Sequence, residues 1–442
     1  QEIAEGTQTK TITDLSNDTE YTFTARAVDK AGNVSGGKTL TLTPGVDTTP
    51  PEEVTQCSST LGNAKVGFAW TDPIDDDFDH VEITWTPGGD TPQTTPGGAG
   101  NAVVTGLANE TAYTFTVKTV DKAGNKSPGR TTIALTPSFM YGWTVLPNTS
   151  AFGSTININD IIYANDKFVA VGASGRIAHS ADGETWTTVT NSGFGTTAIN
   201  RVAWGNGKFV AVGATAKMAY SSDGVTWTAI AAASTTFASS AINGIAWGGG
   251  KFVAVGAAAK MAYSSDGETW TAVGDSQFGT TIINSVAWGG SAGSEKFVAV
   301  GGGAIATPDG KIAYSSDGEN WTLVTSSPFG DALVNRVAWC HDRFIAGTYS
   351  TGQLASSSDG ENWTLITVSG LSSIINDIAW GGPSGAEKFI SAGAMMAHSS
   401  DGENWTAVSV SDAGLNAVRG IVWAQDKFTA VGASGKIAWM TP

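Results

Sequence analysis

The amino-acid sequence predicts an all-β protein in which a β-sandwich region precedes a seven-bladed β-propeller. Three observations support this prediction. Of the 442 residues, 56 are Gly, 14 are Pro and 16 are Trp, and only 14% are charged, against about 25% in an average soluble domain. One segment recurs after 92 residues, and a different segment recurs about every 42 residues. A long helical protein would instead be rich in Ala, Glu, Lys and Leu.

The first repeat places the sandwich region in residues 1–138. Residues 15–35 (LSNDTEYTFTARAVDKAGNVS) and 107–127 (LANETAYTFTVKTVDKAGNKS) each contain an alternating strand followed by a polar turn. The L-x-N-x-T-x-Y segment resembles the tyrosine corner of Greek-key sandwiches. Residues 46–138 resemble a bacterial fibronectin type III domain, with Trp70 as the expected core tryptophan and the prolines of DTTPP in the preceding linker.

Residues 1–45 match only the C-terminal half of that domain. Half a sandwich exposes unpaired strand edges and half of a core. We therefore expect an upstream segment or a neighbouring molecule to complete it, which makes self-assembly through this half-domain a possible partner interaction.

The second repeat assigns residues 139–442 to the propeller. Four signatures recur: [IV]-N-x-[IV]-A-W, K-F-V-A-V-G, K-[IM]-A-Y and S-x-D-G-x-x-W-T. Four short strands in a unit of about 42 residues are typical of a propeller blade. The first three signatures occur seven times, and the last copy stops after its third strand. We expect the strand near Trp143 to complete that blade and so remove the open edge.

The S-x-D-G-x-x-W signature resembles the Asp-box of the BNR, or sialidase-like, propellers. The resemblance implies a structural role for its aspartates and a position opposite the functional face. A short Asp side chain can accept hydrogen bonds from turn backbone, and Gly allows a positive φ. The aspartates concerned are Asp182, Asp223, Asp266, Asp317, Asp359 and Asp401.

If the Asp-boxes lie on one face, the start of each inner strand lies at the opposite mouth of the central channel. Two interpretations of this ring remain open. Each Asn can cap a strand entry by bonding its own backbone, or the amides and arginines can form a polar mouth for ligand hydroxyls or carboxylates, as in glycans. The ring comprises Asn159, Asn200, Asn243, Asn284, Asn335 and Asn376, with Arg201, Arg336 and Arg419 beside them.

The sialidase resemblance also raises glycoside hydrolysis. That family uses three arginines, a tyrosine nucleophile with a glutamate partner and an acidic aspartate, and no such tyrosine–glutamate pair is identifiable here. A glycosidase needs two carboxylates about 5–9.5 Å apart, for which Asp160 and Asp377 are the candidate pair at the mouth. Catalysis requires unlike residues in one place, whereas these blades are nearly identical.

Other chemistry is weakly indicated. The acidic loop DPIDDDFD contains Asp75, Asp76 and Asp77, which could bind Ca²⁺ through oxygen ligands or form a solvated turn. No other cofactor or metal is expected, because Cys57 and Cys340 fall in different domains. The net charge of -16 and the lack of a basic cluster argue against nucleic acid. No apolar run approaches the roughly 20 residues of a membrane span.

Together these observations predict a bacterial extracellular or cell-surface protein that binds glycans or proteins without catalysis, its propeller forming a head on a stalk of sandwich modules. The first alternative is a structural subunit of an extracellular filament, sheath or tail-like assembly. The second alternative is a sialidase-like glycoside hydrolase.

Overall fold

The structure is a computed structural model that describes residues 6, 9–138, 142–147, 151–231, 237–303, 309–366, 368–408, 415 and 417–441. Contacts divide the chain into two units, residues 1–138 and 139–442, which are described separately below. The described helices are three-residue 3-10 turns, η1 (Ala173–Gly175), η2 (Ala214–Ala216) and η5 (Ala433–Gly435). No described helix is long and apolar enough to cross a membrane.

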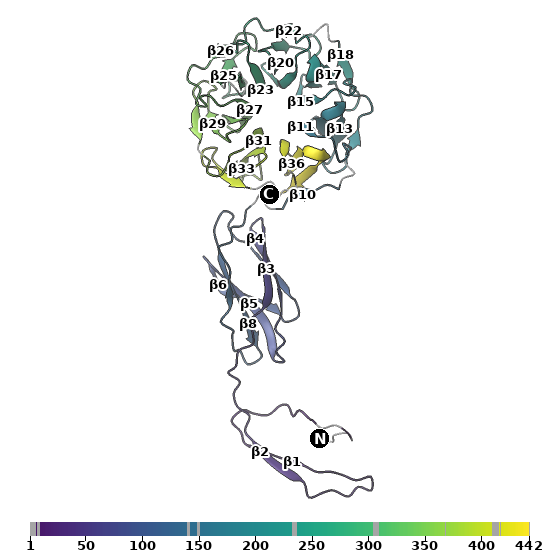
Figure 1. Cartoon of the computed structure of the whole chain (residues 1–442), viewed down its shortest axis with the longest axis vertical. Coiled ribbons are helices and arrows are strands. Elements are labelled where there is room, and N and C mark those ends of the chain that lie inside the picture. Colours follow the sequence, from purple (N-terminus) through teal and green to yellow (C-terminus); the bar gives the residue numbers. More distant parts are fainter. Residues whose placement is uncertain are drawn as a thin grey trace. The chain divides into compact units, whose positions relative to one another are not determined.

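The first unit contains a β-hairpin and a two-sheet sandwich (Figure 1). The hairpin pairs β1 (Tyr21–Ala25) with β2 (Lys38–Leu42). One sandwich sheet has the order β3-β4-β7 and the other β6-β5-β8-β9. Their strands are β3 (Thr55–Gly62), β4 (Lys65–Thr71), β5 (Phe78–Thr86), β6 (Gly89–Pro96), β7 (Asn101–Thr105), β8 (Thr114–Asp121) and β9 (Arg130–Thr131).

Alternating side chains of the two sheets fill the sandwich core. Trp70, Phe68 and Phe115 are buried in one cluster, and Trp70 donates from its indole nitrogen to Asp72. The Tyr113 hydroxyl accepts the Ala108 N–H at 2.9 Å. This bond back to nearby backbone is the tyrosine corner expected from the sequence.

The β1–β2 hairpin buries little of its apolar surface. Leu40 and Leu42 are 59% and 51% exposed, and Val28 and Val34 are 64% and 55% exposed. The Tyr21 hydroxyl still accepts the Ser16 N–H at 3.0 Å, as the equivalent tyrosine of the sandwich does. The hairpin therefore has the local geometry of a sandwich half with an uncovered apolar face.

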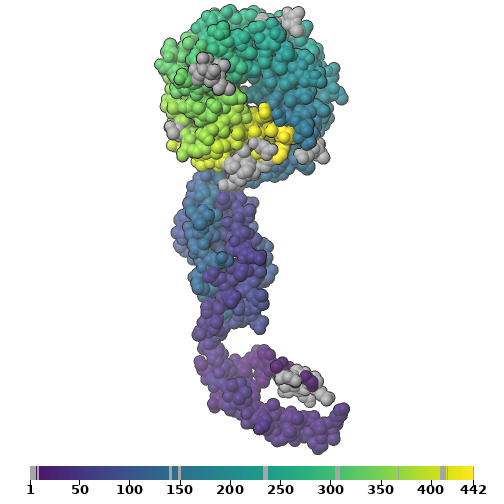
Figure 2. Space-filling view, in the orientation of Figure 1, coloured from purple at the N-terminus to yellow at the C-terminus, as the bar shows by residue number. Residues whose placement is uncertain are grey.

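The second unit is a ring of seven four-stranded antiparallel sheets among the described residues (Figures 1 and 2). Six sheets use consecutive strands, and the ring is the seven-bladed propeller predicted from the repeats. Blade 1 is β11 (Ile158–Ala164), β12 (Lys167–Gly172), β13 (Ile177–Ser180) and β14 (Thr187–Thr188); blade 2 is β15 (Ile199–Gly205), β16 (Lys208–Gly213), β17 (Met218–Ser221) and β18 (Thr228–Ile230); blade 3 is β19 (Ile242–Gly248), β20 (Lys251–Gly256), β21 (Met261–Ser264) and β22 (Thr271–Ala272); blade 4 is β23 (Ile282–Gly289), β24 (Lys296–Gly302), β25 (Gly310–Ser315) and β26 (Thr322–Leu323).

The remaining three blades complete the ring. Blade 5 is β27 (Val334–Cys340), β28 (Arg343–Thr348), β29 (Leu354–Ser357) and β30 (Thr364–Ile366); blade 6 is β31 (Ile375–Gly381), β32 (Lys388–Gly393), β33 (Met396–Ser399) and β34 (Thr406–Val408); blade 7 is β35 (Val418–Ala424), β36 (Lys427–Gly432), β37 (Ile437–Met440) and β10 (Thr144–Val145). Because β10 pairs with β37, a strand from the start of the domain completes the last blade. This closure confirms the predicted joining of the two ends.

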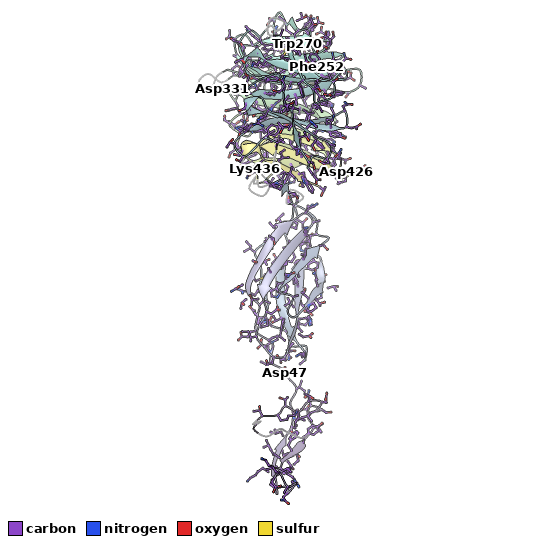
Figure 3. The ribbon with its side chains drawn as sticks, turned by 90° about the vertical axis from the view of Figure 1, so that its right-hand side faces the viewer. Asp47, Phe252, Trp270, Asp331, Asp426 and Lys436 are labelled. Atoms are coloured by element: carbon purple, nitrogen blue, oxygen red, sulfur yellow. The ribbon has the colours of Figure 1, made fainter. Side chains whose placement is uncertain are left out.

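The K-F-V-A-V-G strands form the buried layer of each blade. In β20, every residue after Lys251 is buried, as a strand packed on both faces requires. Phe252 of this strand, labelled in Figure 3, is fully buried. Its ring centre lies 4.5 Å from that of Trp247. Equivalent Trp–Phe pairs recur within other blades. The Trp247 ring also lies against Gly205 of the preceding blade, so these tryptophans pack both within and between blades.

Candidate functional site

A β-bulge near the start of every inner strand builds the channel mouth. The pairing of inner and second strands skips one residue in each blade, for example Asn159 between Ile158 and Asp160. A bulge inserts an extra, unpaired residue and redirects the side chains around it. The skipped residue is Asn in six blades and Arg419 in the seventh.

These bulge residues line a single cavity of about 530 Å³ at the channel mouth. The structure thus brings together the asparagines that the sequence placed in one ring. Two arginines and one tyrosine join them, and the described lining contains no carboxylate. The cavity residues are Asn159, Asn200, Arg201, Asn243, Asn284, Asn335, Tyr349, Ile374, Asn376, Ala417 and Arg419.

The asparagines hold neighbouring blades together through their amide nitrogens. Asn159 donates to the Ile199 carbonyl of the next blade at 2.8 Å, and Asn200 repeats this bond toward Ile242. The other four asparagines make the same contact at 2.7–3.0 Å. The interpretation that each Asn bonds its own backbone is therefore wrong, because the bulge points the amide at the adjacent strand.

Since each amide nitrogen is engaged, the amide oxygens are the groups left to face a ligand. In the described part of the chain, the Asn159 oxygen has a protein donor, Arg419 at 3.5 Å, and the other five amide oxygens have none. An amide oxygen accepts hydrogen bonds from hydroxyl or N–H groups. The mouth is therefore a ring of acceptors with cationic donors beside it.

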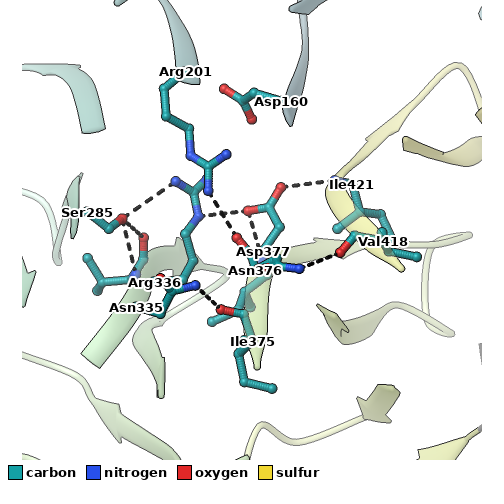
Figure 4. Close-up of polar contacts among 12 residues, drawn as sticks. Asp160, Arg201, Ser285, Asn335, Arg336, Ile375, Asn376, Asp377, Val418 and Ile421 are labelled. Atoms are coloured by element: carbon teal, nitrogen blue, oxygen red, sulfur yellow. Dashed lines mark hydrogen bonds and ion pairs between the residues drawn. The ribbon is translucent and has the colours of Figure 1, made fainter. Parts of the chain in front are cut away.

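Arg201 crosses the channel directly beneath the mouth. Its terminal nitrogens donate to the Asn159 carbonyl of blade 1 at 2.6 Å and to the Asn376 carbonyl of blade 6 at 3.1 Å (Figure 4). Its buried Nε atom has no hydrogen-bond partner. Burial lowers the pKa of Arg201, and the nearby Arg336 lowers it further.

Asp377 does not line the cavity, and it joins neighbouring blades through its polar contacts (Figure 4). It is 3% exposed and accepts Arg336 Nε at 2.8 Å, its neighbour Ile378 N–H at 2.9 Å and the Ile421 N–H of blade 7 at 2.9 Å. Burial opposes the charge of Arg336, but the Asp377 and Asp160 carboxylates raise its pKa. Arg336 is bonded to Asp377 and does not line the cavity.

Asp160 is equally buried but has fewer partners. One carboxylate oxygen accepts the Val202 N–H at 2.9 Å, and no described cation lies within ion-pair distance of it. Burial raises the pKa of Asp160, although Arg201 and Arg336 act in the opposite direction. Neither aspartate lines the mouth cavity, so the two candidate catalytic carboxylates occupy structural positions below it.

Sequence reasoning overlooked Tyr349, which is 43% exposed and lines the cavity. It follows the second strand of blade 5, where five other blades carry alanine: Ala173, Ala214, Ala257, Ala394 and Ala433. The signal that could have found it is this departure from the repeat. Arg419 departs in the same way, because it replaces the asparagine of the other six blades.

The aspartates of the S-x-D-G-x-x-W turns are occupied by their own turns. Asp182 Oδ1 accepts the N–H groups of Glu184 and Thr185 at 2.8 and 2.7 Å, and the Ser180 hydroxyl at 2.9 Å. The Thr185 N–H is the largest influence on Asp182, whose pKa falls to about 2. The same bonds recur at Asp223, Asp266, Asp317, Asp359 and Asp401.

Each of these turns is also joined to the preceding blade. Lys208 donates to the Asp266 carbonyl and pairs with Glu268, and its ammonium group lies 5.3 Å from the Tyr220 ring centre. Equivalent pairs are Lys251–Glu319, Lys296–Glu361, Arg343–Glu403 and Lys427–Glu184. At Lys167 the partner turn carries Val225 in place of the glutamate, and only the Asp223 carbonyl accepts.

In the first unit, the predicted calcium ligands do not form a group of their own. Asp77 lies with Asp47 and Asp121, whose carboxylates fall within 4.8 Å of one another (Figure 3 labels Asp47). Burial and the Asp47 carboxylate raise the pKa of Asp77. Asp75 instead accepts the Glu52 N–H, and Asp76 is not in the group. The oxygen chemistry suits a cation, but both Asp121 oxygens already accept hydrogen bonds from Asn125 and its turn.

Sequence comparison with known proteins matches two parts of known proteins to this chain. Residues 49–134 match the family model "Fibronectin type III domain". The chain is 36% identical over 140 residues to chitinase A1 of Niallia circulans, a match that covers 29% of this chain and 19% of that protein. The chain thus spans about a fifth of the length of this curated relative.

The second unit is similar to solved propellers at low identity. YCF48 bound to a D1 peptide superposes with a TM-score of 0.51 at 18% identity, covering 68% of this chain and 95% of that one. Virginiamycin B lyase of Staphylococcus aureus gives 0.54 at 9% identity, covering 68% and 99%. These likenesses establish the β-propeller fold of the second unit, and residues 49–134 are established as similar to fibronectin type III domains.

Proposed function

We propose that this chain is a non-catalytic extracellular binding protein whose propeller binds a glycan at its channel mouth. Two lines of support lead to glycans in preference to proteins. The match of part of this chain to a chitinase is a link to a carbohydrate-active protein. The mouth cavity, at about 530 Å³, suits one or two sugar units better than a protein surface.

The carrying observation is the ring of six asparagines in this cavity. Their nitrogens are fixed on neighbouring blades, so their oxygens present acceptors in a fixed geometry to ligand hydroxyl groups. A sugar carries several neighbouring hydroxyl groups, each of which can donate a hydrogen bond to one of these oxygens. A preformed ring of this kind reduces the entropy lost on binding.

The placement of the carboxylates supports a non-catalytic role. A hydrolase needs two carboxylates flanking the scissile bond. Asp377 accepts three hydrogen bonds beneath the cavity, and Asp160 is buried on a backbone N–H. The turn geometry of the six aspartates further supports assigning the propeller to the Asp-box class.

A glycan array probed with the whole chain tests the proposal. We expect binding that is lost in Tyr349→Ala, which introduces the alanine that five other blades carry at this position. Arg343→Lys is the matched control, because it restores the lysine of the repeat at a position outside the mouth. Absence of binding to every glycan, or equal binding by Tyr349→Ala, would contradict the proposal.

A structural role in an extracellular assembly is the second candidate. The observation that favours it is the exposed apolar face of the β1–β2 hairpin, where Leu40 and Leu42 are more than half exposed. Exposed apolar strands are frequent sites of association. Sedimentation of the whole chain tests this candidate: concentration-dependent assembly that Leu40→Ser abolishes supports it, and a monomer at all concentrations contradicts it.

A further inference from the structure

We infer that the propeller carries a second sugar site between blades 4 and 5, where the Trp363 ring stacks against a neutral sugar. The site is a cavity of about 470 Å³, a volume that suits one or two sugar units. It lies between the outer strand of blade 4, β26, and the S-x-D-G-x-x-W turn of blade 5. It shares no lining residue with the channel mouth, so the inference goes beyond the proposed function and can fail independently of it.

Trp363 is less covered than most tryptophans at the same position of other blades. It is only partly buried and it lines the cavity. Trp186 is the other partly buried member of the set. The remaining members are 6–8% exposed: Trp227, Trp270, Trp321 and Trp405. Part of the Trp363 ring that its buried counterparts hide is therefore available to a ligand.

The chain holds the Trp363 ring in a fixed position. Its Nε1 atom donates to the Gly360 carbonyl at 3.1 Å, and its ring centre lies 6.4 Å from that of Phe344. Because the indole N–H is already bonded, the accessible part of the ring is an apolar surface. The C–H groups of a pyranose face can pack on such a surface, and a ring that is already fixed reduces the entropy lost on binding.

The lining around Trp363 is rich in hydroxyl groups. Those of Thr322, Thr325, Ser326 and Thr364 belong to exposed residues, and none has a hydrogen-bond partner in the part of the chain that the structure describes. A hydroxyl group can both donate and accept a hydrogen bond. An apolar ring beside several free hydroxyl groups complements a sugar, which has an apolar face and a polar edge.

The charges at the cavity favour a neutral sugar. Glu361 is the one carboxylate among the described lining residues, and it pairs with Lys296. The Lys296 ammonium group also lies 5.1 Å from the centre of the Tyr314 ring, another lining residue. Because the pair is neutral overall, it does not attract an ionic ligand. A sugar hydroxyl group can still donate to the Glu361 oxygen that Lys296 leaves unbonded.

Isothermal titration calorimetry tests this site in the whole chain after Tyr349→Ala has removed binding at the mouth. Because the four hydroxyl residues of the outer cavity are exposed, we expect it to bind more weakly than the mouth. Neutral hexose and N-acetylhexosamine hexamers are therefore titrated at millimolar concentration. We expect residual binding that Trp363→Phe weakens about 2- to 10-fold. Thr325→Trp, which fills the cavity from an exposed position, should abolish it.

Trp227→Phe is the matched control. Trp227 occupies the same position in blade 2, is 6% exposed and donates from Nε1 to the Gly224 carbonyl at 3.2 Å. Each of the two changes to Phe removes one such bond, so we expect similar shifts in the thermal unfolding temperature. Only Trp363→Phe should weaken sugar binding.

The outcomes separate this site from the mouth. Equal affinities of Trp363→Phe and Trp227→Phe, or binding that Thr325→Trp leaves unchanged, would overturn the outer site. Binding by the wild type that disappears completely in Tyr349→Ala would also overturn it and leave the proposed function of the mouth standing. Failure of the wild type to bind any sugar would overturn both. An uncharged peptide that occupies the cavity in place of every sugar would overturn the assignment of its ligand.

Discussion

Replacement of Asp377 by asparagine should destabilise the propeller far more than the same replacement of Asp160. The two aspartates occupy equivalent positions in blades 6 and 1 and are both 3% exposed. They differ in partners. Both oxygens of Asp377 are surrounded by donors, from Arg336, Ile378 and Ile421, so an amide group must turn its NH₂ toward another donor.

The structure gives the size of this difference. Asp377→Asn weakens a hydrogen bond to a charged acceptor, worth about 1.5–3 kcal/mol, and removes the ion-pair partner of the buried Arg336, for a total of about 3–5 kcal/mol. In Asp160→Asn, the amide oxygen can keep the Val202 N–H, and its NH₂ can take the side that has no donor in the described structure. We expect that change to cost less than about 1 kcal/mol.

Urea unfolding followed by tryptophan fluorescence measures both values. Fourteen of the 16 tryptophans lie in the propeller, so the signal reports that unit. Equal m-values would show that the free energies of unfolding are comparable. A loss of less than 1 kcal/mol in Asp377→Asn, or a greater loss in Asp160→Asn, would refute the view that Asp377 joins blades 6 and 7.

Three further predictions concern the repeated contacts. Acidification from pH 4 toward pH 2 should unfold the propeller steeply. Turn hydrogen bonds hold the pKa of aspartates such as Asp182 at about 2, below the ordinary 3.8, so the stability that these carboxylates contribute is lost as the pH falls through that interval. Circular dichroism measures the unfolding, and a signal that stays flat over the interval would count against this explanation. Val225→Glu should add the missing partner for Lys167 and raise stability by up to about 0.5 kcal/mol at low salt; a gain that persists in 1 M salt would contradict the ion-pair explanation. Arg419→Asn should stabilise the ring by about 0.5–1.5 kcal/mol through a seventh bond between blades; a lower melting temperature than the wild type would show that Arg419 itself holds blades 7 and 1 together.

The repeats predicted most of the fold because every blade contains the same local sequence pattern. The four signatures that recur about every 42 residues, the Gly of each Asp-Gly turn and the incomplete last copy predicted the blades and their closure by β10. The tyrosine corner was predicted in the same way from one short motif. These features depend on short-range sequence and on pairing between neighbours, which a repeat displays several times.

The chemistry of the mouth was less predictable. The ring of asparagines was found, but the bulge that turns each amide toward the next blade could not be read from the residue types. The burial of Asp160 and Asp377 depends on the width of the channel and on Arg201 crossing it. Tyr349 was visible as a departure from the repeat, yet its place in the same cavity as Arg419 arises only when the ring closes.

A crystal structure of the whole chain with an oligosaccharide that it binds would test the central claim most directly. We predict that sugar hydroxyl groups lie within hydrogen-bond distance of the asparagine oxygens of the mouth, with the Tyr349 ring against a sugar ring. A ligand bound elsewhere, for example in the cavity that contains Tyr314 and Trp363, with the mouth free of sugar, would contradict the account.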